Sequence, residues 1–193
     1  MSPLSVRRQL LVGAALALLM AATRGQHVAA LGLLPDASWA VFLLAGVYLR
    51  PAWVLVALMG EAFALDVAAI TWGGVSGFCF TPAYTLLLPA HAALWLGGRW
   101  YAARHRQAWS TLMPLAGALL GSAVVAEVLA SGGFYLFSGR FAELSLAELG
   151  ARLVQYFPSS LQALALYTAL AAITHAALSL AAQEPRRSDV SER

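Results

Sequence analysis

Along most of the chain, uninterrupted apolar segments alternate with short connections that contain Arg, Gly or Pro. These segments lack the alternation of apolar and polar residues that is typical of strands in a membrane barrel, which favours helices. Six such segments are present, and the pattern predicts helices over residues 9–22, 39–49, 52–70, 81–101, 109–129 and 146–182. We therefore expect an all-α chain.

Prolines and polar residues predict where several of these helices begin, bend or end. Thr81 and Pro82 provide an N-cap followed by proline at the first helical position, and Pro89 predicts a kink soon after. A further apolar stretch at 28–34 precedes the second helix and stops at a Pro-Asp pair. Because the last segment is too long for one plain span, we expect Pro158 to divide it into an interfacial piece and a membrane helix.

The composition places these helices in a membrane. The chain has 193 residues, of which 61% are hydrophobic and 11% charged, and its mean hydropathy is +0.73. So few polar residues cannot coat a soluble globule. We therefore expect an integral membrane protein with six transmembrane helices in a single domain, residues 1–183. The charged tail at 184–193 is predicted to be cytoplasmic and disordered.

The arginines predict how the six spans are oriented, because cytoplasmic connections collect basic residues. If the N-terminus is cytoplasmic, only Arg24, Arg140 and Arg152 lie outside. The nine arginines that then lie inside are Arg7, Arg8, Arg50, Arg99, Arg104, Arg106, Arg186, Arg187 and Arg193. This distribution predicts that both termini are cytoplasmic and that the connection after the third span is external.

The first segment allows two interpretations. A short apolar run after Arg7 and Arg8 is typical of a signal peptide. Alternatively, Gly13, Ala17 and Ala21 repeat every four residues and form a stripe of small side chains, which lets another helix approach closely. That second helix can belong to this chain or to a partner.

The connection from Asp66 to Tyr84, with the sequence DVAAITWGGVSGFCFTPAY, has an unusual composition for an exposed loop. It contains glycines, aromatic residues and Cys79, the single cysteine, and no charged residue follows Asp66. Loops normally carry polar groups because they meet water, so we predict a binding site here. Cys79 cannot form an internal disulfide, and it is either a small buried residue or a thiolate ligand for a metal that arrives inside a cofactor.

Several ionisable residues are candidates for the same site. An ionisable group within a span is costly, so Asp66 is predicted to bind a ligand, the alternative being that it pairs with an arginine or a backbone donor. Helix geometry places Asp66 and Tyr84 each about one turn from the external surface. His27, in the first external connection, can join them. Glu61 and Glu127 are expected to pair elsewhere, and His91 to be structural.

The chain resembles a known group of vitamin transporters. Six spans, a first helix with a small-residue stripe and external substrate loops resemble the substrate-binding S components of energy-coupling-factor transporters. More specifically, WGGVSGFCFTPAY, preceded by His27 and Asp66 and followed by Arg152, resembles the BtuM family of cobalamin transporters. The resemblance covers essentially the whole chain, and the cysteine loop is its specific part.

This resemblance implies uptake of cobalamin across the bacterial inner membrane, from a site that faces the periplasm or exterior. Cys79 would be an axial ligand of the cobalt and would assist removal of cyanide from cyanocobalamin. The other binding residues implied are His27, Asp66, Tyr84 and Arg152. Gly13, Ala17 and Ala21 are the candidates for docking an energy-coupling-factor module, although members of the family are thought to act alone.

Two alternatives remain open from the sequence. The protein is an S component for another vitamin, in which Cys79 is incidental, or a membrane enzyme with Cys79 as nucleophile and His27 as base. ATP hydrolysis by the chain itself is not expected, because no phosphate-binding G-x-x-x-x-G-K-[ST] motif is present. Nucleic acid is not an expected partner, since membrane orientation explains the arginines.

Overall fold

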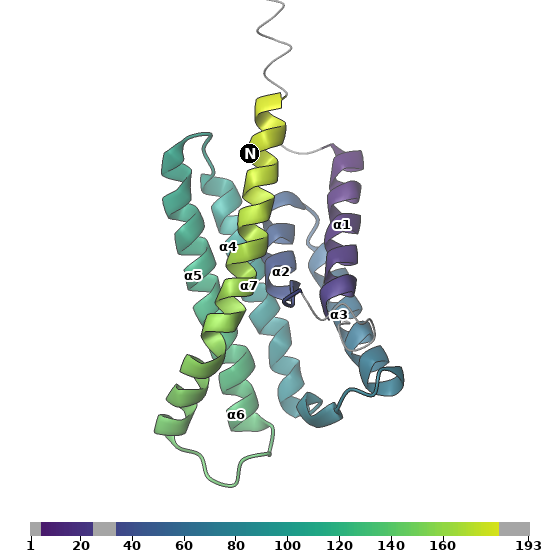
Figure 1. The fold of residues 1–193 in the computed structure, drawn as a ribbon, viewed down its shortest axis with the longest axis vertical. Coiled ribbons are helices and arrows are strands. Elements are labelled where there is room, and N and C mark those ends of the chain that lie inside the picture. Colours follow the sequence, from purple (N-terminus) through teal and green to yellow (C-terminus); the bar gives the residue numbers. More distant parts are fainter. Residues whose placement is uncertain (1–4, 25–33, 182–193) are drawn as a thin grey trace, which may run out of the picture.

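The computed structural model describes residues 5–24 and 34–181, and within these ranges every regular element is a helix. This confirms the all-α prediction. The α-helices are α1 (Val6–Arg24), α2 (Ser38–Tyr48), α3 (Trp53–Trp72), α4 (Leu87–Arg104), α5 (Leu112–Glu127), α6 (Gly133–Phe137) and α7 (Leu146–Ala181) (Figure 1). Shorter 3₁₀ turns are η1 (Gly77–Cys79), η2 (Pro82–Leu86) and η3 (Trp109–Thr111), and η4 (Val128–Gly132) is a π-helical segment.

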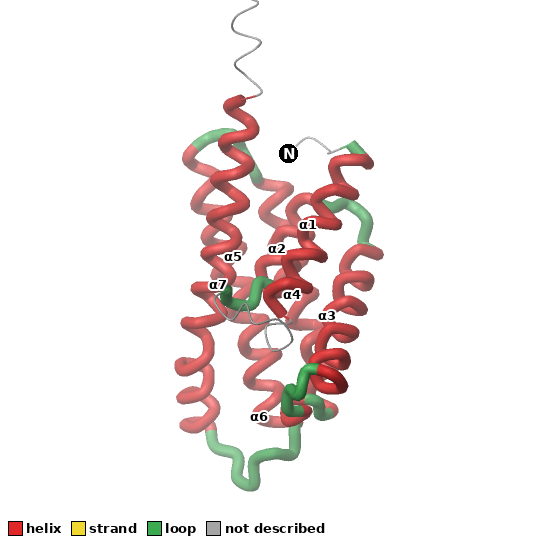
Figure 2. The backbone as a smooth tube through the Cα atoms, turned by 45° about the vertical axis from the view of Figure 1, so that its right-hand side comes forward, coloured by secondary structure: helices red, strands yellow, loops and turns green. Residues whose placement is uncertain are grey.

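The helices run up and down along the long axis of the molecule (Figures 1 and 2). The α2–α3 and α4–α5 connections lie at one end, together with the start of α1 and the end of α7. We call this the basic end, because Arg7, Arg8, Arg50, Arg104 and Arg106 lie there. The α3–α4 and α6–α7 connections lie at the opposite end, which we call the aromatic end for the phenylalanines described below.

Four helical segments are long and apolar enough to cross a membrane: Val6–Arg24, Trp53–Trp72, Trp109–Phe137 and Leu146–Ala181. Their outer surfaces carry exposed large apolar side chains such as Leu18, Val56, Met113 and Ile173. A soluble protein rarely exposes so much contiguous apolar surface, whereas lipid tails solvate it well. The structure thus supports the membrane protein that the composition predicts.

Helices α2 and α4 are not among these four segments. Helix α2 has only 11 residues, and α4 carries Arg99 and Arg104 toward its end. Arg99 Nη1 donates to the carbonyl oxygens of Leu49 and Arg50, at 3.3 Å each, and so satisfies backbone acceptors beyond the end of α2.

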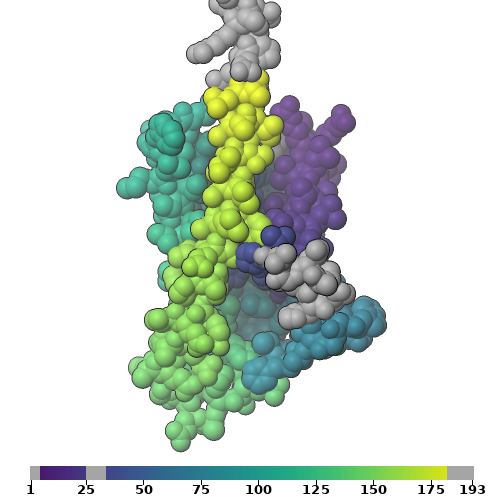
Figure 3. Space-filling view, viewed as in Figure 1, coloured from purple at the N-terminus to yellow at the C-terminus, as the bar shows by residue number. Residues whose placement is uncertain are grey.

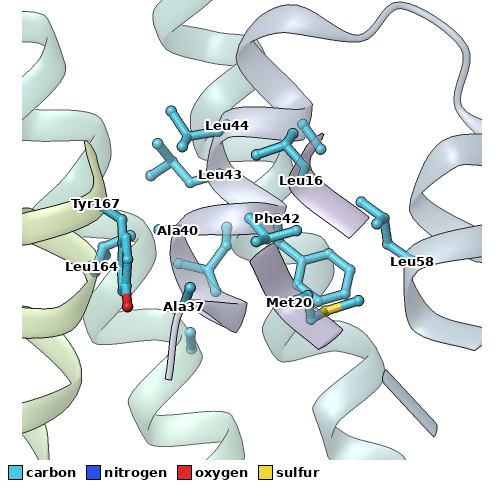
Figure 4. Packing of buried hydrophobic residues seen from close by; sticks show 14 of the residues in the cluster. Leu16, Met20, Ala37, Ala40, Phe42, Leu43, Leu44, Leu58, Leu164 and Tyr167 are labelled. Atoms are coloured by element: carbon cyan, nitrogen blue, oxygen red, sulfur yellow. The ribbon is translucent and has the colours of Figure 1, made fainter. Parts of the chain in front are cut away.

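Helix α2 lies at the centre of the bundle and is apolar around its whole circumference, which is typical of a buried helix. Ala40, Val41, Phe42, Leu43 and Ala45 are completely buried. Figure 4 shows how side chains of other helices converge on α2 from several sides. Those labelled there are Leu16 and Met20 of α1, Leu58 of α3, and Leu164 and Tyr167 of α7. The first segment is therefore an integral part of the packed core.

Two predictions about how prolines affect the helices were wrong. Pro158 lies inside a continuous α7, which has an inclined lower part in Figure 1 but is not divided into two elements. A proline removes one backbone donor and bends a helix without necessarily ending it. Pro89 is the third residue of α4, where its missing N–H has no intrahelical partner to lose, so it lies in the first turn of α4 and not in its interior.

Other boundaries differ by a few residues from those expected. The predicted helix at 109–129 continues through η4 and α6 to Phe137. The π-helical segment lies within this run, and such segments insert one extra residue per turn. The apolar stretch at 28–34 falls almost entirely outside the described residues, and the tail at 184–193 lies wholly outside them.

A candidate ligand site at the aromatic end

The loop between α3 and α4 presents Cys79 at the surface. Gly74 adopts a φ of +68°, which favours glycine, and allows the chain to turn away from α3. Ser76 then caps η1, because its Oγ accepts from the backbone N–H of Phe78 at 3.2 Å. Cys79 is the last residue of this turn, and its thiol is free and exposed.

Aromatic side chains flank Cys79 on both sides. Phe80 lies 4.8 Å from Tyr84 and 5.8 Å from Phe63, measured between ring centroids, which attaches the loop to α3 and η2. Phe78 lies 5.8 Å from Phe134 of α6. Phe78 and Phe80 nevertheless remain 49% and 43% exposed, so both offer apolar area to a ligand.

Asp66 is held by an ion pair with Arg24. The Nε of Arg24 donates to Asp66 Oδ1 and its Nη2 to Asp66 Oδ2, both at 2.7 Å, in the bidentate geometry that is strongest for this pair. The hydroxyl of Tyr84 donates to Asp66 Oδ2 at 2.7 Å. The side chains of Arg24 and Asp66 are only 13% and 23% exposed. One carboxylate thus joins the ends of α1 and α3 to η2.

The remaining donor group of Arg24 extends this network toward α2. Arg24 Nη1 donates to the Oγ of Ser38 at 2.9 Å, and Ser38 in turn donates to Asp36 Oδ1 at 2.6 Å. Asp36 Oδ2 lies 3.9 Å from Arg24 Nη1. Two carboxylates therefore surround one guanidinium.

Tyr84 lies in η2, beyond the end of α3. Burial raises the pKa of its phenol, and the hydrogen bond to Asp66 raises it further. The phenol therefore stays protonated at neutral pH and keeps donating to the carboxylate.

Arg152 lies on the first part of α7, at the same end of the molecule. Its Nη2 donates to Glu148 Oε1 at 2.8 Å, one helical turn away. Its guanidinium lies 4.2 Å from the ring centroid of Phe141 and 5.5 Å from that of Tyr135, within the range of cation–π attraction. These contacts fix the side chain while leaving it partly exposed.

Ring contacts link the Cys79 loop to Arg152. Phe78 contacts Phe134, Phe134 lies 6.0 Å from Phe141, and Phe141 lies beneath Arg152. On its other side the loop reaches the Arg24–Asp66 pair through Phe80 and Tyr84. In Figure 3 the face toward the viewer is hollowed in its lower part, between the blue α3 region and the green α6–α7 region. Cys79 belongs to the loop that follows α3, and Phe78 of this loop contacts Phe134 of α6.

Four of the five residues that the sequence predicts for the site lie at the aromatic end of the described structure. Asp66 and Tyr84 are in direct contact, and Cys79 and Arg152 are linked to them through aromatic side chains. His27 lies outside the described residues. Sequence reasoning missed Arg24 as a member of this site. The signal was present, because a carboxylate inside a span requires a partner and Arg24 is one of the three arginines assigned to that side.

Within residues 5–24 and 34–181, no three His, Cys, Asp or Glu side chains gather closely enough to hold a metal ion. A metal inside a macrocycle brings most of its own ligands and needs no such cluster. Comparison with known proteins adds no assignment: the sequence matches no family model and no curated protein.

Proposed function

We propose that this protein binds cobalamin at the aromatic end and takes it up across the bacterial inner membrane, as an S component of the BtuM type. The observation that carries the proposal is the exposed thiol of Cys79 on a glycine-rich turn between two exposed phenylalanines. A corrin supplies four equatorial ligands to cobalt, so the protein needs to supply only one or two axial donors.

The surroundings of Cys79 suit a large ligand with an apolar face and a polar edge. Phe78 and Phe80 offer flat apolar surface for the corrin face. Arg152 and Tyr84 carry donors suited to the amide groups at its edge. Asp66 has both carboxylate oxygens engaged by Arg24, so we assign it a positioning part, holding Tyr84 and the end of α1 in place. His27 completes the set through the family resemblance.

The proposal includes six spans with both termini in the cytoplasm. In this arrangement α2 and α4 cross together with the four longer apolar segments, which agrees with their up-and-down course in Figure 1. Arginines gather at the basic end, whereas the α6–α7 connection, which contains Arg140, and the first part of α7, which contains Arg152, lie at the other (Figure 1). The positive-inside rule then makes the basic end cytoplasmic and the aromatic end external.

Cys79 also provides a route for removing cyanide from cyanocobalamin. In this step the thiolate of Cys79 forms a bond to Co(III) as the bond from cobalt to cyanide breaks. Cyanide leaves with its electron pair and takes up the proton lost by the thiol, so cobalt keeps its oxidation state. Because the product stays bound through sulfur, we expect one conversion per protein molecule rather than rapid turnover.

A groove on α1 supports an interaction with a coupling module. Gly13 and Ala17 line a cavity of about 620 Å³ between α1 and α3, at the basic end, together with Trp53, Ala57 and Glu61. Small side chains at a membrane-exposed groove allow close approach of a partner helix. Ala21, the third residue of the small-residue stripe, is half-buried and does not line this groove.

The test is the absorption spectrum of detergent-purified protein incubated with cyanocobalamin, for wild type and for Cys79→Ala. We expect a shifted corrin spectrum and retained corrinoid with wild type, and loss of the spectral shift in Cys79→Ala. Thr85→Ala, which removes an exposed hydroxyl at the same end, is the matched control and should behave as wild type.

The same experiment separates the alternatives. Retained corrinoid with an identical spectrum in wild type and Cys79→Ala would contradict cobalt ligation by sulfur. No corrinoid in either protein would overturn the proposal and favour another vitamin. A membrane enzyme would instead show activity that thiol alkylation blocks in the absence of any corrinoid.

A further inference from the structure

A second cavity lies at the basic end, away from Cys79. Its volume is about 480 Å³, and it is enclosed by α2, the end of α4, the start of α5 and the last turns of α7. Most of its walls are apolar and include Leu43 and Val47 of α2, Leu112 and Leu115 of α5, and Ala172 and Ala176 of α7. A cavity of this size and lining is typical of a site for an apolar or amphipathic small molecule.

Polar side chains gather where the walls reach the α4–α5 connection. The hydroxyl of Tyr101 lies 2.8 Å from Nδ1 of His105, and the rings of His105 and His175 meet edge to face at 5.7 Å. Arg106 and Gln107 follow directly along the chain and line the same cavity. Among its described lining residues there is no Asp or Glu. This part of the cavity therefore favours an anion.

The cavity is flanked by surfaces that face lipid. Met113 next to it on α5 is 81% exposed, and Ile173 next to it on α7 is 66% exposed. In Figure 1, α5 and α7 cross in the lower half of the molecule and separate toward the basic end. Because α5 and α7 both line the cavity and both carry lipid-facing side chains beside it, a ligand from the bilayer can reach it.

Tryptophans place the polar part of this cavity at the membrane surface. Trp109 lines the cavity and is 89% exposed. Trp100 is partly exposed, and the guanidinium of Arg104 lies 4.1 Å from its ring centroid. Tryptophan and arginine together are typical of the headgroup level of a bilayer. The cavity thus runs from the headgroup level into the hydrocarbon.

We propose that this cavity binds one anionic phospholipid, with an acyl chain between α5 and α7 and its phosphate at Arg106 and His105. An acyl chain matches the apolar walls, and a basic pocket between helices at this side of a membrane suits an anionic headgroup. The inference rests on the cavity, its rim charge and its lipid-facing flanks, and it does not depend on cobalamin.

The test measures which lipid stays bound to the full chain. The protein is exchanged into mild detergent with an equimolar mixture of phosphatidylglycerol and phosphatidylcholine of identical acyl chains, and retained lipid is quantified by native mass spectrometry. We expect phosphatidylglycerol to be retained over phosphatidylcholine. Arg106→Gln should lower that preference by about fivefold, from the usual contribution of one basic residue near an anionic headgroup. Arg104→Gln, at the same end but outside the cavity lining, is its control.

Filling the cavity tests the site of the acyl chain. Ala172→Trp should abolish retention of both lipids, whereas Ile173→Trp, which projects the same side chain toward the bilayer, should leave it unchanged. Ala176→Phe, nearer the surface, is a second filling variant should Ala172→Trp not fold. Equal retention of the two lipids by wild type, or undiminished retention in a folded filling variant, overturns the proposal.

Discussion

At the residue scale, Arg24 and Asp66 neutralise each other where neither charge would be tolerated alone. Both lie in segments apolar enough to span a membrane, and the bidentate contact satisfies both carboxylate oxygens. Tyr84 and Ser38 use the remaining hydrogen-bonding capacity. The pair therefore fixes the geometry of the aromatic end whether or not it touches a ligand.

Asp66→Asn should destabilise the protein by about 3 kcal/mol, because it leaves a largely buried guanidinium with only the more distant carboxylate of Asp36 as counter-charge. Thermal unfolding in detergent, followed by circular dichroism, measures this as a lowered melting temperature. Glu148→Gln is the matched control. It breaks the more exposed pair with Arg152, and should cost at most about 1 kcal/mol. Equal losses in the two variants would contradict the assigned role of Asp66.

His105 is predicted to make stability depend on pH. Burial, and then the nearby His175, lower the pKa of His105 below its usual 6.5. Below pH 6.5, His105 therefore takes up a proton more readily in the unfolded chain than in the folded protein, which favours unfolding. The contribution of His105 to the free energy of unfolding is complete above pH 6.5 and is lost as the pH falls. The hydroxyls of Tyr101 and Thr111 lie 2.8 and 3.3 Å from Nδ1 of His105.

The measurement is the melting temperature from pH 7.5 to 5 for wild type and His105→Gln, in detergent free of anionic lipid. The variant should lose less stability across this range than wild type. An identical slope in the two proteins would show that His105 does not contribute.

At the element scale, the contact between α2 and α4 depends on glycine. A Cβ atom at Gly98 would collide with the carbonyl oxygen of Leu43, and one at Gly46 with that of Trp95. These two glycines let the backbones touch and bring Phe42 against His91, whose rings stack at 4.1 Å. The buried His91 thus has a structural role, as expected from the sequence.

Gly98→Ala should destabilise the bundle by about 2 kcal/mol, the usual cost of forcing an extra carbon into a packed core. Gly60→Ala on α3 is the control, because a Cβ there meets nothing within 4 Å and alanine is the better helix former. Thermal unfolding of both variants measures the difference. A Gly98→Ala protein as stable as Gly60→Ala would mean that α2 and α4 can separate without loss.

At the scale of the whole molecule, the arrangement of spans determines which side of the membrane each connection meets. Cys79 is the single cysteine, so labelling of its thiol reports the side of the membrane on which the aromatic end lies. A Cys79→Ser background allows a new cysteine at Gln107 or Arg50 to report the basic end. With six spans, a membrane-impermeant thiol reagent should label Cys79 only from outside, and cysteines at Gln107 and Arg50 only from inside.

The pattern of labelling also tests α2 and α4 separately. If α4 does not cross, positions 79 and 107 will be labelled from the same side. If α2 does not cross, a cysteine at Asp36 will be labelled from the same side as one at Arg50. Either result would contradict the proposed six spans.

The sequence by itself determined the helical class, the membrane environment and the approximate helix boundaries, because these depend on local apolar runs and on composition. It also singled out the loop of Cys79, since an uncharged run of glycine and aromatic residues is visible without any long-range contact. Pro89 and Pro158 were misjudged because the effect of a proline depends on its place in the finished helix and on what packs beside it.

Only the tertiary structure decided which distant residues meet. Arg24 and Asp66 are 42 positions apart, and no local pattern shows that the guanidinium of one lies against the carboxylate of the other. The path from Phe78 to Arg152 and the cavity between α5 and α7 likewise arise from how the helices cross. Crossing geometry follows from the packing of whole helix faces, which the linear order of residues does not show.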